Sequence, residues 1–140
     1  MDSERDVDFR LRLAQGFLDE ARDDVERSRW RSGVDNSQLS VENAIKAVIA
    51  RHAPVPRTHN LAPLLDELLA TASLSTAQRE AVVALCACAD ELGPEQHVRS
   101  DYGEEASFQT PWDLFGEDDA RRSLTVAEQA LALARSILDR

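Results

Sequence analysis

Apolar residues recur along this chain at spacings of three and four, the period that places side chains on one face of an α-helix. The pattern predicts five helices, at residues 5–31, 35–53, 61–69, 75–92 and 117–139. The first and last carry regular apolar seams, typical of long helices that pack with nearly parallel or antiparallel axes. We therefore predict an all-α fold, a five-helix up-and-down antiparallel bundle that forms a single domain over residues 1–140.

The expected helix boundaries follow from residues with strong local preferences. Gly33 is expected to break the first helix and turn the chain. Asp35 and Gln38 then have the spacing of a capping box, which satisfies unpaired N–H groups at a helix start. Pro54 ends the second helix because its ring clashes with a continued helix and its nitrogen carries no hydrogen. Between residues 95 and 116 the apolar period fades, which predicts one long irregular connection.

The last predicted helix carries two apolar seams. One follows Ala120 to Leu138 in alternating steps of four and three, and the other is formed by Val126, Ala130, Leu133 and Ile137. Two seams require two neighbours. One could be the first helix, and the other is either an inner helix or a second copy of the chain, so we predict a homodimer.

Composition supports a helical core and restricts the partners. Hydrophobic residues make up 43% of the chain but aromatic residues only 5%, which leaves too few strand formers for a sheet. The net charge of −10 argues against a broad basic surface that follows a phosphate backbone, and it leaves room for a local basic site. No apolar run reaches the roughly 20 residues that span a bilayer, and the acidic start does not resemble a signal peptide. We expect a cytoplasmic protein without a membrane segment.

Motifs for metal or cofactor chemistry are absent from the sequence. Cys86 and Cys88 lie two apart in a predicted helix, where side chains point about 200° apart, so they share a metal or a disulfide poorly. Glycine-rich phosphate loops, HExxH and GxSxG do not occur. His52 and His97 have no supporting pattern and are expected in solvent. We predict neither a metal nor a cofactor.

Several segments, taken in order, resemble the HEPN family (higher eukaryotes and prokaryotes nucleotide-binding domains). The centre of the second helix reads SVENAIKA at residues 40–47, and a proline-containing loop leads to Thr58-His59-Asn60-Leu61 at the next helix. Further on, GPEQHVRSDY at residues 93–102 is similar to the family's N-P-x-x-x-x-x-R-Y-P-D-like segment. An alanine-rich last helix with an acidic start completes the resemblance, which covers nearly the whole chain.

The resemblance implies a nucleotide- or nucleic-acid-binding module that pairs with itself and works with a separately encoded minimal nucleotidyltransferase. It places ligand-binding residues at Arg99, Lys46, Glu42, His59 and Tyr102. Arg99 is expected on the long connection as the main anion contact, because a planar guanidinium matches phosphate oxygens. Glu42 and Lys46 form either an ordinary surface pair or the lining of a cleft. His59 either satisfies polar groups where two helices meet or joins Arg99 and Lys46 in a pocket.

Catalytic members of the HEPN family resemble metal-independent endoribonucleases with an R-x(4–6)-H motif, in which Arg stabilises phosphate charge and His transfers protons. No arginine–histidine pair in this chain has that spacing, and Arg99 is followed by no histidine. We therefore predict a module without catalytic residues. Two alternatives remain: a metal-independent endoribonuclease toxin of a toxin–antitoxin pair, in which another residue replaces the histidine, and a helical adaptor whose seams serve only dimerisation.

Overall fold

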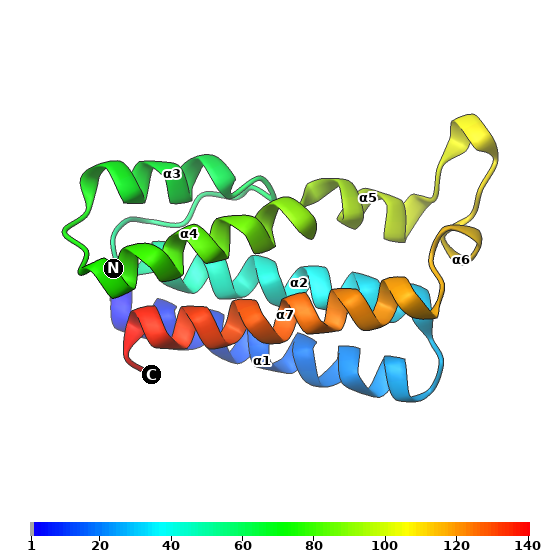
Figure 1. Ribbon diagram of the computed structural model, residues 1–140, viewed down its shortest axis with the longest axis horizontal. Helices are drawn as coiled ribbons and strands as arrows, with labels where there is room; N and C mark the ends of the chain where they lie inside the picture. The colour runs from blue at the N-terminus through cyan, green and yellow to red at the C-terminus, as the bar shows by residue number, and fades with distance from the viewer. Residues whose placement is uncertain (1) are drawn as a thin grey trace.

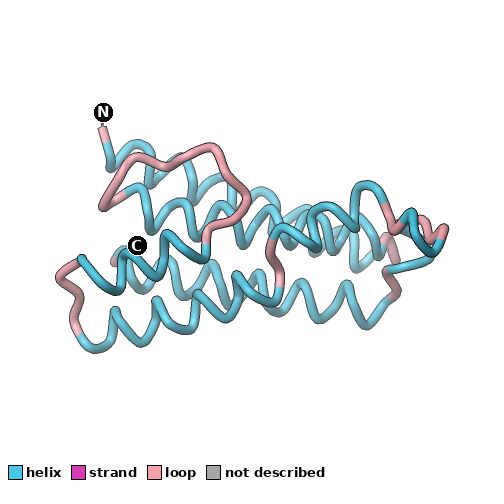
Figure 2. Tube along the Cα trace, turned by 90° about the horizontal axis from the view of Figure 1, so that it is seen from above, coloured by secondary structure: helices cyan, strands magenta, loops and turns pink. Residues whose placement is uncertain are grey.

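The computed structural model describes residues 2–140, and within this range it contains helices and connections but no strand (Figures 1 and 2). The helices are α1 (Ser3–Glu26), α2 (Trp30–Ala50), α3 (Ala62–Thr71), α4 (Thr76–Glu91), α5 (Pro94–Tyr102), α6 (Pro111–Leu114) and α7 (Glu117–Leu138). A single 3-10 turn lies at Glu105–Ser107. The predicted all-α bundle is confirmed. The five expected helices are all present, and α5 and α6 are additional helices inside the expected irregular connection.

The helices lie along one long axis, as Figure 1 shows. α1 runs away from the N-terminal end, α2 returns, α4 runs outward again, and α7 returns beside α2, so both termini lie at the same end. The connection between α2 and α3 doubles back along the bundle in both views (Figures 1 and 2), and α3 therefore runs in the same direction as α2. This long return places residues 58–61 beside the middle of α2.

α2 is the central element, and it contacts each of the other six helices. Buried residues occur all around it, including the polar side chains of Ser37, Gln38, Ser40, Glu42 and Asn43. A helix buried on every side must satisfy its polar groups internally. Ser40, for example, donates its hydroxyl to the carbonyl of Ala14 in α1 at 2.8 Å. None of the helices in residues 2–140 is long and apolar enough to cross a membrane.

The boundary between α1 and α2 differs from the one expected. The chain turns at Ser28, whose φ of 60° is left-handed, and α2 already begins at Trp30. Gly33 is therefore inside α2, where a Cβ would lie 3.3 Å from Cγ2 of Val25, so the glycine permits close packing of α1 on α2. Asp35 is also inside the helix and does not cap it. Its carboxylate instead accepts a hydrogen bond from the Ser100 hydroxyl at 3.1 Å.

Both apolar seams of α7 pack against other helices of the chain, with Leu124 and Leu133 only partly buried. Ala130 is fully buried, Val126 and Ile137 are nearly so, and α7 packs against α1, α2 and α4. The second neighbour that the sequence required is therefore met by inner helices. These helices cover most of the apolar surface from which the sequence predicted a second subunit. The homodimer is therefore supported only by the family resemblance.

The segment expected to be irregular, residues 95–116, begins with α5 and ends with α6. Pro94 stops α4 and also occupies the first turn of α5, where a missing N–H costs little. Gly103 ends α5 with a φ of 75°, and a Cβ there would lie 2.3 Å from the carbonyl oxygen of Gln109. Glu104 and Gln109 pair as an isolated bridge and close a short hairpin that carries Phe108 at its tip.

Candidate functional site

One stripe of α2 is polar although it faces other helices. Arg31, Asp35, Gln38 and Glu42 follow one another by four, three and four residues, so they share one face. This face meets α5 and the connection before α3. The residues that come together there form what we call the polar seam: Arg31, Asp35, Gln38, Glu42, His59, His97, Ser100 and Asp101.

Glu42 forms one end of the polar seam with two partners. Its side chain is only 5% exposed, and one carboxylate oxygen lies 2.5 Å from Nδ1 of His59. The other oxygen lies 3.5 Å from Nζ of Lys46, whose side chain is also largely buried. The Glu42–Lys46 pair is thus not an ordinary surface pair. Glu42 also contacts His59, which lines a cavity. Three of the five predicted ligand-binding residues, Glu42, Lys46 and His59, are therefore close together.

His59 continues the polar seam into α5 through His97. The two imidazole rings stack with centroids 4.6 Å apart. Nε2 of His97 lies 3.7 Å from a carboxylate oxygen of Asp101, one turn further along α5. His97 was expected in solvent, and the structure corrects this, because α5 turns it inward onto His59. Its Nδ1 is buried and has no hydrogen-bond partner among residues 2–140.

Asp35 occupies the other end of the polar seam. Burial raises the pKa of its carboxyl group, and the nearby Asp101 raises that pKa further, while the Ser100 hydroxyl and Arg31 oppose the rise. Asp35, His97 and Asp101 each offer a ligand atom within 4.8 Å of the others, a grouping that could hold a metal ion. Arg31 lies 3.7 Å from Asp101 and competes for the same carboxylate.

A cavity of about 230 Å³ opens between α2, α3, the end of α4 and the start of α5. Gln38, Glu42 and His59 line one side, and Gln96 lines the other. Gln38 is only 1% exposed, yet its Oε1 has no hydrogen-bond partner within the described chain, and the same holds for the buried Oε1 of Gln96. Buried polar atoms normally find partners, so these two unpaired oxygens are an exception within the interior beside the cavity.

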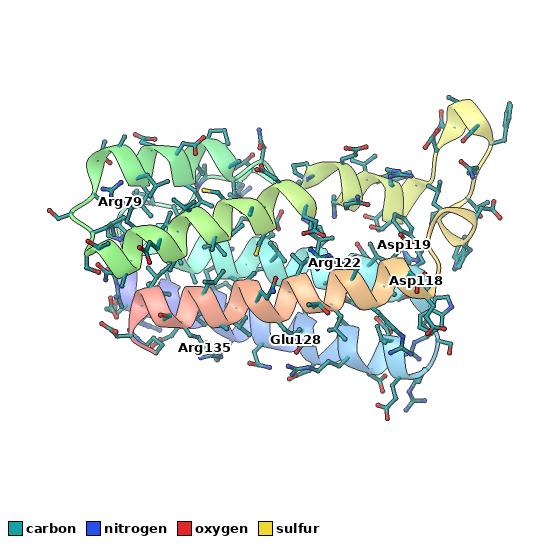
Figure 3. All side chains as sticks on the ribbon, in the orientation of Figure 1. Arg79, Asp118, Asp119, Arg122, Glu128 and Arg135 are labelled. Carbon is teal, nitrogen blue, oxygen red and sulfur yellow. The ribbon has the colours of Figure 1, made fainter. Side chains whose placement is uncertain are left out.

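Arg99 lies apart from this group. It is in α5, not on a loop as expected, and it lines a neighbouring cavity of about 410 Å³ against α7. Its guanidinium lies 3.8 Å from Glu104 and 5.8 Å from the centre of the Phe115 ring. In the same cavity Arg122 of α7 points towards the end of α4 (Figure 3) and forms a bidentate pair with Glu91. Arg99 therefore does not converge with Lys46 and His59.

Tyr102, the fifth predicted residue, is on the surface at the far end of α5. Its side chain lies with Phe108 and Trp112 around a shallow, open cavity. The three residues are 75%, 92% and 72% exposed, and we call them the aromatic patch. Such a patch of exposed aromatic side chains is typical of a surface that contacts another molecule.

Sequence reasoning missed the α5 half of the polar seam. Gln96, His97, Ser100 and Asp101 share a face only if residues 94–102 are helical, and a glycine–proline pair in the sequence indicated a stop. The available signal was Pro94 itself, which also favours the first position of a helix. On α2, the regular polar positions within an otherwise apolar run were a second signal.

Comparisons with known proteins agree with this architecture. A model of the HEPN domain family matches residues 7–137. Among solved structures, the crystal structure of TT1696 from Thermus thermophilus is similar, with a TM-score of 0.68 and 17% sequence identity over 94% of this chain and 97% of that chain. At that identity the likeness shows the fold alone. The search of curated proteins finds no matching relative. Because the family model spans almost all of the chain, this protein belongs to the HEPN domain family.

Proposed function

We propose that this protein is a HEPN module that binds a nucleotide, or a nucleotide unit of RNA, and works with a separately encoded minimal nucleotidyltransferase. HEPN domains are modules related to nucleotides and RNA. The observation that carries the proposal is the cavity of about 230 Å³ beside Glu42 and His59, whose lining also includes the polar side chains of Gln38, Asn60 and Gln96. A concave site with a few convergent polar groups is typical of a site that binds a small molecule.

Arg99 supplies the anion contact in this proposal. Its cavity shares Glu91, Leu92 and Gln96 with the cavity beside His59, so the two lie on either side of a common wall. Nε of Arg99 is buried without a partner among residues 2–140, and its contact with Glu104 is loose. A phosphate that reaches across the wall would gain charge-assisted hydrogen bonds from this guanidinium.

Nucleotide binding can be tested by isothermal titration calorimetry. We expect adenosine monophosphate to bind the wild-type protein, and Arg99→Ala to weaken binding by roughly 10- to 100-fold, the loss of a charge-assisted hydrogen bond. Arg22→Ala is the matched control, because Arg22 lines neither cavity and pairs with exposed acidic groups on α1 and α7. Binding that Arg99→Ala leaves unchanged would place the anion contact elsewhere, and no binding of any nucleotide would refute the proposal.

The aromatic patch is the surface we assign to the nucleotidyltransferase. Tyr102 ends α5, Trp112 lies in α6 and Phe108 lies between them, and these elements are at the end of the bundle away from both termini (Figure 1). Aromatic side chains are enriched where proteins meet. We expect co-expressed protein and the product of an adjacent minimal nucleotidyltransferase gene to co-purify, and Phe108→Ser with Trp112→Ser to abolish this. Phe9→Ser, at an exposed position of α1, is the control.

A homodimer remains part of the proposal on the strength of the resemblance. Sedimentation velocity at tens of micromolar, roughly the range in which stable dimers persist, distinguishes a chain of 15.5 kDa from its dimer. A monomer over the whole concentration range would remove this part of the proposal and leave the nucleotide site untouched.

A metal-independent ribonuclease is the second candidate, and one observation favours it. Arg31 and His97 lie on different helices, and each has an atom 3.7 Å from the carboxylate of Asp101. An arginine for phosphate charge and a histidine for proton transfer are thus adjacent in space, although no R-x(4–6)-H motif is present in the sequence. All three side chains are partly exposed.

Ribonuclease activity is tested directly with a structured RNA and excess chelator. Our leading proposal expects the RNA to stay intact over hours. Cleavage that disappears in both His97→Ala and Arg31→Ala, but persists in Arg22→Ala, would instead establish the ribonuclease.

A further inference from the structure

We propose that a groove between α1 and α7 binds a linear chain of phosphate groups, either the backbone of a single-stranded nucleic acid or a free oligophosphate. We call it the arginine groove, and its lining includes Arg5, Asp8, Arg12, Gln15, Arg135 and Arg140. Its volume is about 500 Å³, and it shares no lining residue with either cavity of the proposed nucleotide site. The inference therefore goes beyond the proposed function and does not depend on it.

The arginine groove gathers positive charge on a chain whose net charge is −10. Four arginines line it, and the one carboxylate in its described lining belongs to Asp8. Asp8 is already engaged, because it pairs with Arg140, which also contacts Glu4. In both cavities of the proposed nucleotide site, by contrast, carboxylates outnumber the lysine and arginine side chains. A chain of phosphates therefore meets less repulsion in the arginine groove.

Three arginines of the groove are available to a ligand. Arg5, Arg12 and Arg135 form no ion pair with any residue between 2 and 140, although the chain has 26 acidic and 16 basic residues. Arg135 reaches from α7 towards α1 (Figure 3), where it makes a 3.4 Å contact with the amide oxygen of Gln15. Guanidinium groups bind phosphate oxygens in a planar fork, so three unpaired ones around one groove favour a phosphorylated ligand.

The spacing of these arginines matches an extended ligand. Arg5 and Arg12 are seven residues apart on α1, so they share a face and are separated by about 10 Å along the helix axis. Arg135 lines the opposite side of the groove, on α7. Successive phosphates of one chain can contact arginines placed along such a groove, and each contact adds to the affinity. We therefore assign the groove to several phosphates in a row.

The test uses the full-length protein and two probes. Fluorescence anisotropy measures a labelled oligouridylate of about ten nucleotides, within the site sizes of single-strand binders, and calorimetry measures inorganic triphosphate. We expect at least one probe to bind at low salt, and Arg12→Ala with Arg135→Ala to weaken that binding by about 10- to 100-fold, the range for lost charge-assisted hydrogen bonds. Binding of the oligouridylate alone identifies a nucleic-acid backbone, and binding of triphosphate alone identifies a free oligophosphate. Binding of both supports recognition of the phosphate chain itself.

Arg22→Ala with Arg121→Ala is the matched control. It removes the same charge from the same two helices, but Arg22 pairs with Asp19 and Arg121 with Glu117, and neither arginine lines the groove. Equal losses in the two double variants would show that only net charge matters and would overturn the inference. Failure of both probes to bind the wild type would overturn it as well.

Two further measurements keep the test decisive. If the double variant of the groove fails to fold by circular dichroism, Arg5→Ala, at an exposed position, replaces it and should also weaken binding. Adenosine monophosphate should bind the groove variants as it binds the wild type, so the proposed function can fail or stand independently. Loss of probe binding in Arg99→Ala, with full binding in the groove variants, would place the phosphates at the nucleotide site and overturn the inference.

Discussion

Burial changes the contribution of the Glu42–Lys46 ion pair to stability. A glutamate and a lysine one turn apart on an exposed helix stabilise it by a few tenths of a kcal/mol, about 0.2–0.5. Here both side chains are largely buried, and Glu42 also holds His59. Removing one member of a buried pair leaves the other charge without compensation, which costs far more than the pair contributes on a surface.

We therefore expect Glu42→Ala to destabilise the protein by about 3 kcal/mol, because Lys46 is left as an unpaired buried charge. Urea unfolding followed by circular dichroism measures this. Glu128→Ala is the control: Glu128 forms an exposed contact with Arg22 and should change the stability by less than about 0.5 kcal/mol. Equal effects of the two substitutions would mean that Lys46 reaches water once Glu42 is removed.

Asp35 makes stability depend on pH. Burial and the nearby Asp101 raise the pKa of its carboxyl group in the folded protein above the ordinary value of 3.8. The unfolded chain therefore loses this proton first as pH rises, and the contribution of Asp35 to stability falls between 3.8 and the raised pKa. Above that window, the ionised carboxylate costs stability at every pH.

Asp35→Asn removes this cost and keeps an oxygen that can accept from Ser100. We expect the variant to have a higher melting temperature than the wild type at pH 7, with the difference vanishing as pH falls below 3.8. Thermal unfolding from pH 3 to pH 8, roughly the range over which carboxyl groups titrate, gives the comparison. A wild type that is the more stable protein at neutral pH would show that Asp35 is stabilised as an anion by Arg31 and His97.

The turns at the ends of α1 and α5 set the direction of the next segment of the chain, and they thereby set which side chains reach the polar seam. Ser28 follows the C-cap of α1 in a left-handed conformation, the position that usually carries glycine. The turn sets the angle at which α2 returns along α1. Gly103 has the same role at the end of α5, where it directs the chain into the hairpin that carries Phe108.

Replacing Ser28 by glycine should stabilise the protein by about 0.5–1 kcal/mol, because glycine has no Cβ to strain in the left-handed region. Ser28→Ala is the matched opposite and should not stabilise, since alanine keeps the Cβ. Guanidinium unfolding of the two variants, measured side by side, separates them. A glycine variant no more stable than the alanine variant would show that the Ser28 side chain makes up for the strain.

The whole molecule is a bundle built around one fully covered helix, and its apolar surfaces follow from that. The polar seam lies on the side of α2 that faces α5, and α1, α4 and α7 cover much of its remaining surface. The aromatic patch is the exposed apolar feature at the far end of the bundle. The net charge of −10 favours encounters with basic surfaces, and a homodimer would have to offset the repulsion between its two acidic copies.

Ala130→Asp tests whether the second seam of α7 belongs to the fold. Ala130 is fully buried inside the chain, so a carboxylate there should cost more than about 4 kcal/mol and unfold much of the protein. Ala132→Asp, at an exposed position of the same helix, should leave it folded. Circular dichroism and sedimentation give the readout. A folded Ala130→Asp protein that is monomeric at a concentration where the wild type is dimeric would restore the interpretation of this seam as a subunit interface.

The sequence by itself determined the helices and the class of fold. The spacing of apolar residues depends only on the period of the helix, so the five long elements could be predicted locally. The family could also be recognised, because its motifs keep their order along the chain. Two of the errors fell at Gly33 and Pro94, where a residue that often breaks helices serves instead for close packing or for a helix start. The expected cap at Asp35 failed with the first of these, because α2 already begins at Trp30.

Only the tertiary structure decided which polar residues meet. Arg31 and Asp101 are far apart in the chain and adjacent in space, and so are His59 and His97, since α5 lies on α2 and the α2–α3 connection doubles back. Tertiary packing likewise placed Arg99 in a different cavity from His59. It also packed inner helices of the same chain against the second seam of α7. The physical reason is that helix periodicity assigns a residue to a face, whereas the partner of that face is set by loop paths and by competition among all the apolar surfaces of the chain.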